Sequence, residues 1–277
     1  MKQYPSIPRV EDAPSEIFES GHLWLLEKID GAQLRFQLQE SGLIRFSDRD
    51  RVYTDSDSIP EPYQHAVRHV RNNLDRDALR NAVEDVESVV FFGEATHRHT
   101  IDYEWDRLPS FLGFDVYSAD NGGFLPPDAV QGIFRQLSLE PINAFERELN
   151  TRDFDPDSYT VPDSAWYDGP AEGVIIKNKR GGRAKLLHPE FQDAEDFVPI
   201  EGSAEEVTET LATEKRFQRL SQRLTDRGKP VSFETLYDEM LTDIIRQEHG
   251  RLYHGASSLD LSAFRSELAA RTRAFLG

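Results

Sequence analysis

The sequence contains no cysteine, no long apolar run and little lysine. The absence of cysteine excludes a disulfide framework, a thiolate metal site and a thiol nucleophile. No apolar stretch approaches the ~20 residues of a membrane span, and the N-terminal residues, MKQYPSIPRVEDAPSE, are too polar for a signal peptide. We therefore expect a soluble, cytoplasmic protein with no membrane partner. Its 277 residues are enough for one large domain, or for a domain and a smaller one.

The seven lysines are unevenly placed. Three of them, Lys177, Lys179 and Lys185, lie within nine residues. Most of the positively charged residues of the chain, 25 of 32, are arginine. Arginine is permanently charged, but the amine of lysine can lose its proton when it is buried or near other cations, and it then becomes a nucleophile. Retention of lysine in this stretch, and at Lys28, indicates chemistry that arginine cannot perform.

Acidic residues outnumber basic ones along the whole chain. Fifty Asp and Glu against 32 Lys and Arg give a formal charge of −18. This balance is typical either of an acidic protein that avoids nucleic acid or of a protein from a high-salt cytoplasm, where repulsion is screened within ~3 Å at 1 M salt. The preference for arginine over lysine favours the high-salt, halophilic interpretation. Net charge is then weak evidence against a nucleic-acid partner.

The order of the predicted elements indicates a mixed first part of the chain. Alternating apolar residues predict strands over 22–36 and 43–46, and near-helical spacing predicts helices over 60–86 with a break at 75–77. A loop rich in Asp and Pro spans 150–171. Further strands are predicted at 88–93, 111–117, 173–178 and 184–187, and a further helix at 127–137.

From about residue 203 the apolar period is helical and remains so. Helices are predicted over 203–224, 230–248 and 258–276, with Ser232 and Ser258 as starts. We therefore predict two domains, residues 1–198 and residues 199–277, joined by the acidic segment 192–202.

Charged residues occur at the ends of several predicted strands. Lys28 follows an apolar run and precedes Asp30-Gly31, where an amine can be desolvated and directed at a ligand. Glu94 ends a buried strand, and a short strand begins at Glu172 and ends at Lys177. Taken singly, each is more typical of a hairpin turn, an ordinary core strand or a solvated charge. Their order and spacing make them a set.

This set resembles the motifs of the covalent nucleotidyltransferase superfamily, which includes polynucleotide ligases and capping enzymes. KIDGAQ (28–33) resembles the first motif, and SDR (47–49) resembles the arginine-bearing segment after it. GEATHRHTIDY (93–103) and FLGFDVY (111–117) resemble the third motif and its companion, and EGVIIK (172–177) and AKLL (184–187) resemble the fourth and fifth. The resemblance covers roughly residues 20–190 and is greatest to RNA ligases of the T4 second-ligase type.

The resemblance implies an α+β fold. Its first part would be a nucleotidyltransferase domain, the ATP-grasp-like adenylation domain of ligases, with antiparallel sheets and flanking helices. In DNA ligases and capping enzymes this domain is usually followed by an OB barrel of short strands, whereas residues 203–277 are predicted to be helical. A small all-helical C-terminal domain is similar to the RNA ligases instead.

The lysines and one glutamine would carry the chemistry that the resemblance implies. Lys28 would attack the α-phosphate of ATP and form a lysyl-AMP intermediate, and Lys177 and Lys185 would hold that phosphate. Gln33 would assist strand joining. The attack needs a neutral amine, and we expect neighbouring cations or a bound metal to lower the pKa of Lys28.

The remaining matching residues would bind the nucleotide and a metal. Glu27 would present its backbone to the adenine, and Arg49 and Glu94 would hold the ribose. Phe114 would stack on the base. Glu172, with Glu94, would bind Mg²⁺ or Mn²⁺, because Mg²⁺ is usually held by one or two carboxylates and substrate oxygens.

The fifth motif departs from the family pattern. Close relatives offer two lysines two residues apart, and the second position is Leu187 in this chain. Lys179 or Arg183 are the candidates to replace the missing charge. The stretch 177–185 contains five cations and no acid, so it is also a candidate contact for a nucleic-acid backbone.

Two further motifs, a histidine pair and a glycine-rich segment, do not predict a functional site. His97 and His99 have the spacing of a metal-ligand pair, but the sequence offers no evident third ligand, and in the family match His99, Ile101 and Tyr103 fall at structural positions. We therefore do not expect zinc. RGGR (180–183) lacks the Lys-Ser/Thr of a P-loop and is interpreted as a hairpin turn.

We conclude from the sequence that the chain is an ATP-dependent RNA ligase that joins 3′-OH and 5′-phosphate ends, with RNA as its partner in nicked duplexes or RNA/DNA hybrids. The alternatives are a DNA or mixed-substrate ligase, an adenylyltransferase that stops at the 5′-adenylylated strand, and a non-catalytic module that binds RNA ends on a ligase fold. Retention of Lys28, Glu94 and Glu172 argues against the last of these, and Leu187 argues for it.

Overall fold

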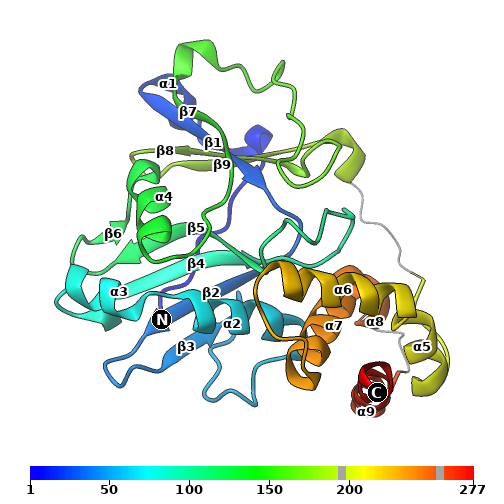
Figure 1. Ribbon diagram of the computed structural model, residues 1–277. Helices are drawn as coiled ribbons and strands as arrows, with labels where there is room; N and C mark the ends of the chain where they lie inside the picture. Colours follow the sequence, from blue (N-terminus) through cyan, green and yellow to red (C-terminus); the bar gives the residue numbers. More distant parts are fainter. Residues whose placement is uncertain (193–197, 254–258) are drawn as a thin grey trace. The chain divides into compact units, whose positions relative to one another are not determined.

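A computed structural model describes residues 1–192, 198–253 and 259–277 (Figure 1). Contacts divide the described residues into two units. The first contains residues 1–96 and 100–192, and the second contains residues 97–99 together with the described residues from 198 onward. None of the helices in the described parts combines the length and apolar character that a membrane span requires.

Nine strands form the two sheets of the first unit. Their bounds are β1 His22–Lys28, β2 Ala32–Leu38, β3 Ile44–Ser47, β4 Val89–Ala95, β5 Phe111–Ser118, β6 Gly123–Phe124, β7 Ala144–Asn150, β8 Gly173–Asn178 and β9 Arg183–Leu187. One sheet has the order β7-β1-β8-β9 and the other β3-β2-β4-β5-β6, and every neighbouring pair is antiparallel. The α+β prediction is confirmed.

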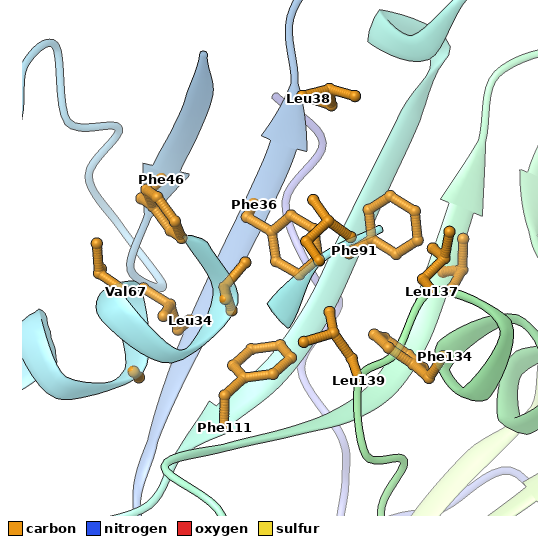
Figure 2. Close-up of a cluster of buried hydrophobic side chains, with 14 of the residues drawn as sticks. Leu34, Phe36, Leu38, Phe46, Val67, Phe91, Phe111, Phe134, Leu137 and Leu139 are labelled. Atoms are coloured by element: carbon orange, nitrogen blue, oxygen red, sulfur yellow. The ribbon is translucent and has the colours of Figure 1, made fainter. Parts of the chain in front are cut away.

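Helices cover one face of the five-stranded sheet. These are α2 Glu61–Asn73, α3 Arg76–Ala82 and α4 Pro127–Gln136, whereas α1 Glu16–Glu19 packs with the four-stranded sheet through Ile17. The predicted break is confirmed, because Asp75 caps α3 by accepting from Ala78 N. Figure 2 shows Phe36, Phe91 and Phe111, from neighbouring strands, packed with Phe134 of α4 in a fully buried core. This buried layer packs the helices onto the five-stranded sheet, whose strands β2, β4 and β5 also carry residues of the site described below.

The strand region predicted over 22–36 consists of two strands that belong to different sheets. The chain leaves β1 at Lys28, turns through Ile29-Asp30-Gly31 and enters β2 at Ala32. A Cβ at Gly31 would lie 2.5 Å from the carbonyl oxygen of Ala95, so only glycine permits this close approach to β4. The change of sheet brings Lys28 to the boundary between the two sheets.

Strand β7 was not predicted from the sequence. Residues 146–148 are Glu-Arg-Glu, and they are exposed because β7 is an edge strand, where charged side chains are common. The pairing with β1 shifts register, and Glu148 has a φ of 54°. This irregularity hides the alternating pattern that marks the other strands.

The second unit is helical in its described part. Its helices are α5 Ala204–Leu211, α6 Glu214–Asp226, α7 Phe233–Gln247, α8 His249–Leu252 and α9 Leu261–Leu276. The predicted helix over 203–224 is divided, because Thr213 caps a new helix by accepting from Arg216 N. Ser232 caps α7 as predicted. The predicted start at Ser258 and residues 193–197 of the predicted linker lie outside the described residues.

Candidate active site

A cavity of about 190 Å³ in the first unit is lined by both sheets and by the N-terminal segment. Of the nine residues predicted for the site, seven line this cavity: Lys28, Gln33, Arg49, Glu94, Phe114, Lys177 and Lys185. Glu172 contacts Lys28 beside the cavity. Glu27 is buried behind it.

Lys28 and Glu172 form the central ion pair. Strands β1 and β8 are paired so that Lys28 lies opposite Gly173, which brings Nζ of Lys28 to 2.5 Å from Oε1 of Glu172. Burial lowers the pKa of Lys28, but the charge and hydrogen bond of Glu172, together with Glu94 and Asp30, raise it, and the net shift is upward. The expectation of a pKa lowered by neighbouring cations is therefore wrong for the protein alone, because the carboxylates around Lys28 dominate.

Carboxylates surround the amine of Lys28. Burial raises the pKa of Glu94 to about 8, Lys28 opposes this shift, and the charges of Glu172 and Asp30 add to it. Acidic groups close enough to disfavour each other's ionisation are stabilised by a divalent cation. The donor set at Glu172 and Glu94 consists of carboxylate oxygens, which fits Mg²⁺ or Mn²⁺.

The turn after Lys28 is held by the segment that follows β4. Oδ2 of Asp30 accepts hydrogen bonds from the backbone N–H groups of Thr100, at 2.6 Å, and Ile101, at 2.9 Å. The N–H of Asp30 donates to the hydroxyl of Tyr103, at 3.0 Å. Ile101 and Tyr103 are buried, so the structural interpretation of these two residues is confirmed. They position the turn that carries Lys28.

Glu27 anchors β1 through both its backbone and its side chain. Its N–H donates to the carbonyl of Asn143, at 2.9 Å. Its carboxylate accepts from Ser164 Oγ, at 2.5 Å, and from Asn143 Nδ2, at 3.0 Å. Burial raises the pKa of Glu27, and these hydrogen bonds oppose the rise. The side chain of Glu27 is therefore held inside the protein.

Lys177 is buried in an ion-pair network on β5. Its Nζ lies 2.9 Å from Oδ2 of Asp115 and donates to the carbonyl of Phe114, at 2.8 Å. Arg183 reaches the same carboxylate oxygen at 2.9 Å. Burial lowers the pKa of Lys177, and Asp115 partly restores it. Burial raises the pKa of Asp115, but Lys177 and Arg183 outweigh it and hold this pKa below its usual value. Lys177 lines the cavity, but the carboxylate of Asp115 already compensates its charge.

Lys185 and Gln33 present polar groups to the cavity that have no partner among the described residues. In the described parts of the chain, Lys185 has no carboxylate within ion-pair distance, and Nε2 of Gln33 is buried with no hydrogen bond. A buried amide donor without a partner costs about 1–3 kcal/mol. Such groups in one cavity indicate a polar, anionic ligand.

A family model of RNA ligases matches residues 21–187. The chain belongs to the RNA ligase family. The matched range contains every residue of the site described above except the N-terminal segment. Among curated proteins, none matches the sequence.

Solved RNA ligases share the fold. An RNA ligase from Naegleria gruberi with pyrophosphate is 16% identical, with a TM-score of 0.52 over 69% of this chain and 57% of that one. A variant of the Naegleria ligase with ATP and Mn is 17% identical, with a TM-score of 0.50 over 68% and 56%. An archaeal ATP-dependent RNA ligase is 15% identical, with a TM-score of 0.51 over 98% and 63%. This member of the family thus spans less than two thirds of the length of these neighbours.

Neither candidate replacement for the missing lysine of the fifth motif lies in the cavity of this RNA ligase family member. Lys179 is paired with Glu148, at 2.7 Å, and with Asp128, at 3.2 Å. Arg183 forms an ion pair with Asp115. Leu187 is paired with Gly173 of the neighbouring strand β8. Of the five cations in this stretch, Arg180 and Lys185 are those without a carboxylate partner among the described residues. The hairpin turn predicted at 180–183 is confirmed, with Gly181 at a φ of +90°.

The N-terminal segment is part of the cavity and was missed from the sequence. Residues 4–7 line it. Tyr4 donates to Asp115, at 2.9 Å, and accepts from Nε of Arg183, at 3.0 Å. Its ring meets that of Phe114 edge-on, with centroids 5.1 Å apart. The only sequence signal was an aromatic residue in a polar arm, because Asp115, Phe114 and Arg183 lie more than a hundred residues away along the chain.

Proposed function

We propose that this family member is an ATP-dependent RNA ligase of the T4 second-ligase type, which joins a 3′-OH to a 5′-phosphate in nicked RNA duplexes or RNA/DNA hybrids. The main support is the contact of Lys28 with Glu172 at a cavity that also contains Phe114 and Lys185. An amine, an aromatic face and an unpaired ammonium in one cavity suit a nucleotide with its α-phosphate at the amine. We further propose residues 1–198 as the adenylation domain and 199–277 as the helical domain.

The reaction would proceed in three displacements at phosphorus. In the first, Nζ of Lys28 bonds to the α-phosphorus of ATP, the bond to the bridging oxygen breaks, pyrophosphate leaves, and the amine gives up a proton. In the second, an oxygen of the RNA 5′-phosphate displaces Lys28 from AMP, and the amine regains a proton. In the third, the 3′-OH attacks that 5′-phosphate, loses its proton, and AMP leaves.

Catalysis of such transfers depends on positioning and on neutralising charge. Lys185 would pair with the α-phosphate, because it lines the cavity and no carboxylate of the described residues competes for its ammonium. Lys177 would act mainly by position, since Asp115 already balances its charge. Glu172 and Glu94 would hold Mg²⁺ or Mn²⁺, which would supply positive charge at the phosphate and offset the effect of these carboxylates on Lys28.

The base and the joining step would use the other lining residues. Phe114 would stack on the adenine, a contact worth about 1–3 kcal/mol, with Glu27 presenting its carbonyl to the base edge. Arg49 is exposed at the mouth of the cavity and would contact the ribose together with Glu94. The unpaired amide of Gln33 would assist strand joining.

The decisive experiment incubates the full chain with α-labelled ATP and Mg²⁺ or Mn²⁺ at molar salt, beside Lys28→Ala and Lys28→Arg. We expect a covalent label on the wild type that withstands base and is released by acid, as a phosphoramidate is. Neither variant should be labelled, because a guanidinium does not form this bond. No label on the wild type, or equal label on Lys28→Ala, would refute the catalytic proposal.

The substrate is tested with nicked duplexes that carry RNA or DNA on the 3′-OH side. Sealing of the RNA-containing nicks supports the RNA ligase, and sealing of all-DNA nicks alone supports the DNA ligase alternative. Leu187 favours one further alternative, an enzyme that transfers AMP but joins poorly, because neither Lys179 nor Arg183 replaces the absent charge. Accumulation of the 5′-adenylylated strand would support it.

We also propose that the protein is halophilic, which its acidic composition supports, and that it acts in RNA repair. At a formal charge of −18, repulsion of an RNA backbone at low salt would oppose binding, and salt screens it. We expect adenylylation and sealing both to rise between low and molar salt, which a salt titration of each step would measure.

A further inference from the structure

Three histidines gather in the second unit. His97, His99 and His249 offer ring nitrogens that all lie within 4.8 Å of one another. The sequence suggested only the first two as a pair, and the third ligand comes from the start of α8, far along the chain. This cluster lies outside the residues used in the proposed ligase reaction.

The geometry of the cluster approaches that of a three-histidine metal site. Nε2 of His97 lies 3.1 Å from Nε2 of His99. In tetrahedral zinc sites the Zn–N bonds are about 2.0–2.1 Å, which places two ligand nitrogens about 3.3 Å apart. The ring of His249 stacks on that of His97 with centroids 3.7 Å apart, so metal binding would turn this ring until its nitrogen points at the shared ion.

The backbone holds the two segments together independently of the rings. The N–H of Arg98 donates to the carbonyl of Arg246 in the last turn of α7, at 2.8 Å. His97 and His99 are two residues apart, which in an extended segment directs both side chains to the same side. Nδ1 of His249 is buried and has no hydrogen bond with any described residue.

We propose that His97, His99 and His249 bind one first-row divalent transition metal ion, with zinc as the best fit. Imidazole nitrogen is a preferred ligand of zinc, whereas Mg²⁺ prefers oxygen. Three protein ligands leave a fourth position for water. His99 is exposed, so the ion can enter from solvent. Bound metal would tie residues 97–99 to α8 and stabilise the second unit.

The test uses the full chain without an affinity tag, stripped with a chelator and then given zinc at molar salt. Elemental analysis after gel filtration should find one zinc per chain in the wild type and in His22→Ala, a control at an exposed histidine outside the cluster. His99→Ala should bind at least ~100-fold more weakly, since loss even of an outer-shell partner costs 10–100-fold. The thermal midpoint of the wild type should rise with zinc, and that of His99→Ala should not.

Cobalt(II) provides a readout that does not depend on stability. The wild type should show the visible bands of tetrahedral cobalt, and these bands should be lost in His249→Ala and in His99→Ala, with circular dichroism confirming that His99→Ala is folded. Excess Mg²⁺ should not displace the ion, and Glu172→Gln should bind it normally, which separates this site from the proposed catalytic one. Absence of stoichiometric zinc in the wild type, or equal binding after all three histidines are replaced, would overturn the proposal.

Discussion

The amine of Lys28 lies 2.5 Å from a carboxylate oxygen of Glu172, at the point where β1 and β8 are paired. This contact keeps the amine protonated in the protein alone, because the carboxylate raises its pKa against the effect of burial. If Lys28 is the nucleophile that we propose, it becomes reactive only after another cation binds the carboxylate of Glu172. Metal binding at Glu172 would then control the reactivity of Lys28.

Replacement of Glu172 by glutamine should move the pH dependence of adenylylation. The neutral amine is the reactive form, so the rate rises with pH through the pKa of Lys28, and removal of the carboxylate lowers that pKa. We expect the rising limb to shift to lower pH while the maximal rate falls at least ~100-fold through loss of a metal ligand. Label transfer from ATP, measured across pH, checks this. Glu190→Gln, at an exposed position, is the control, and a limb that does not move would show that Glu172 does not control the amine.

Two lysines of the same hairpin should behave differently. Lys185→Ala should slow adenylylation about 10²–10³-fold, because an unpaired ammonium at the cavity is lost. Lys179→Ala should change the rate by less than about twofold, because Lys179 is paired with Glu148 and Asp128 outside the cavity. Single-turnover labelling of both variants compares them directly. Equal losses would contradict the assignment of Lys185 alone to the phosphate.

Gln33 should affect joining without stabilising the fold. Replacement of this residue by leucine removes a buried donor that has no partner, so the free energy of unfolding should stay the same or rise by up to about 1–3 kcal/mol. Sealing of a pre-adenylylated nick should fall roughly 100-fold, with lysyl-AMP formation retained. Gln222→Ala, exposed on α6, is the control. A variant that is less stable and still seals normally would identify Gln33 as structural.

Asp115 should contribute to stability in a pH-dependent way. Its carboxylate balances buried Lys177 and Arg183, and removal of one partner from a buried network costs about 3–5 kcal/mol. We expect that loss in Asp115→Asn at pH 7, measured by urea unfolding, and little change in Asp57→Asn, which is exposed.

The pH dependence of this loss has a definite sign. The folded pKa of Asp115 is lowered, so its contribution is fully present above the ordinary carboxyl pKa of about 3.9 and is lost as pH falls through the folded value. The difference between the wild type and Asp115→Asn should therefore shrink as pH falls below about 4. A difference that is constant with pH would mean that packing, rather than charge, explains the loss.

Motif order along the chain was enough to predict the family, and seven of the nine residues that it predicted for the site line one cavity. The motifs KIDGAQ, EGVIIK and AKLL have lysines and acids at or near the ends of short apolar runs. In the structure, Lys28 ends β1, Glu172 directly precedes β8 and Lys185 lies in β9. Local signals also predicted the break at Asp75 and the cap of α7 at Ser232. Strand β7 was not predicted, because its charged residues and its bulge interrupt the alternation of apolar and polar residues by which strands are predicted.

Composition and motif spacing by themselves determined the absence of thiol chemistry, the acidic surface and the family. Only the tertiary structure decided which side chains are in contact. It pairs Lys28 with Glu172 and Lys177 with Asp115. It also places Tyr4 at the cavity and His249 beside His97 and His99. The reason is physical. A local pattern specifies which face of a strand or helix a side chain occupies, whereas its partner is set by strand pairing and register between segments far apart in the chain, and a shift of one residue would turn each side chain to the opposite face.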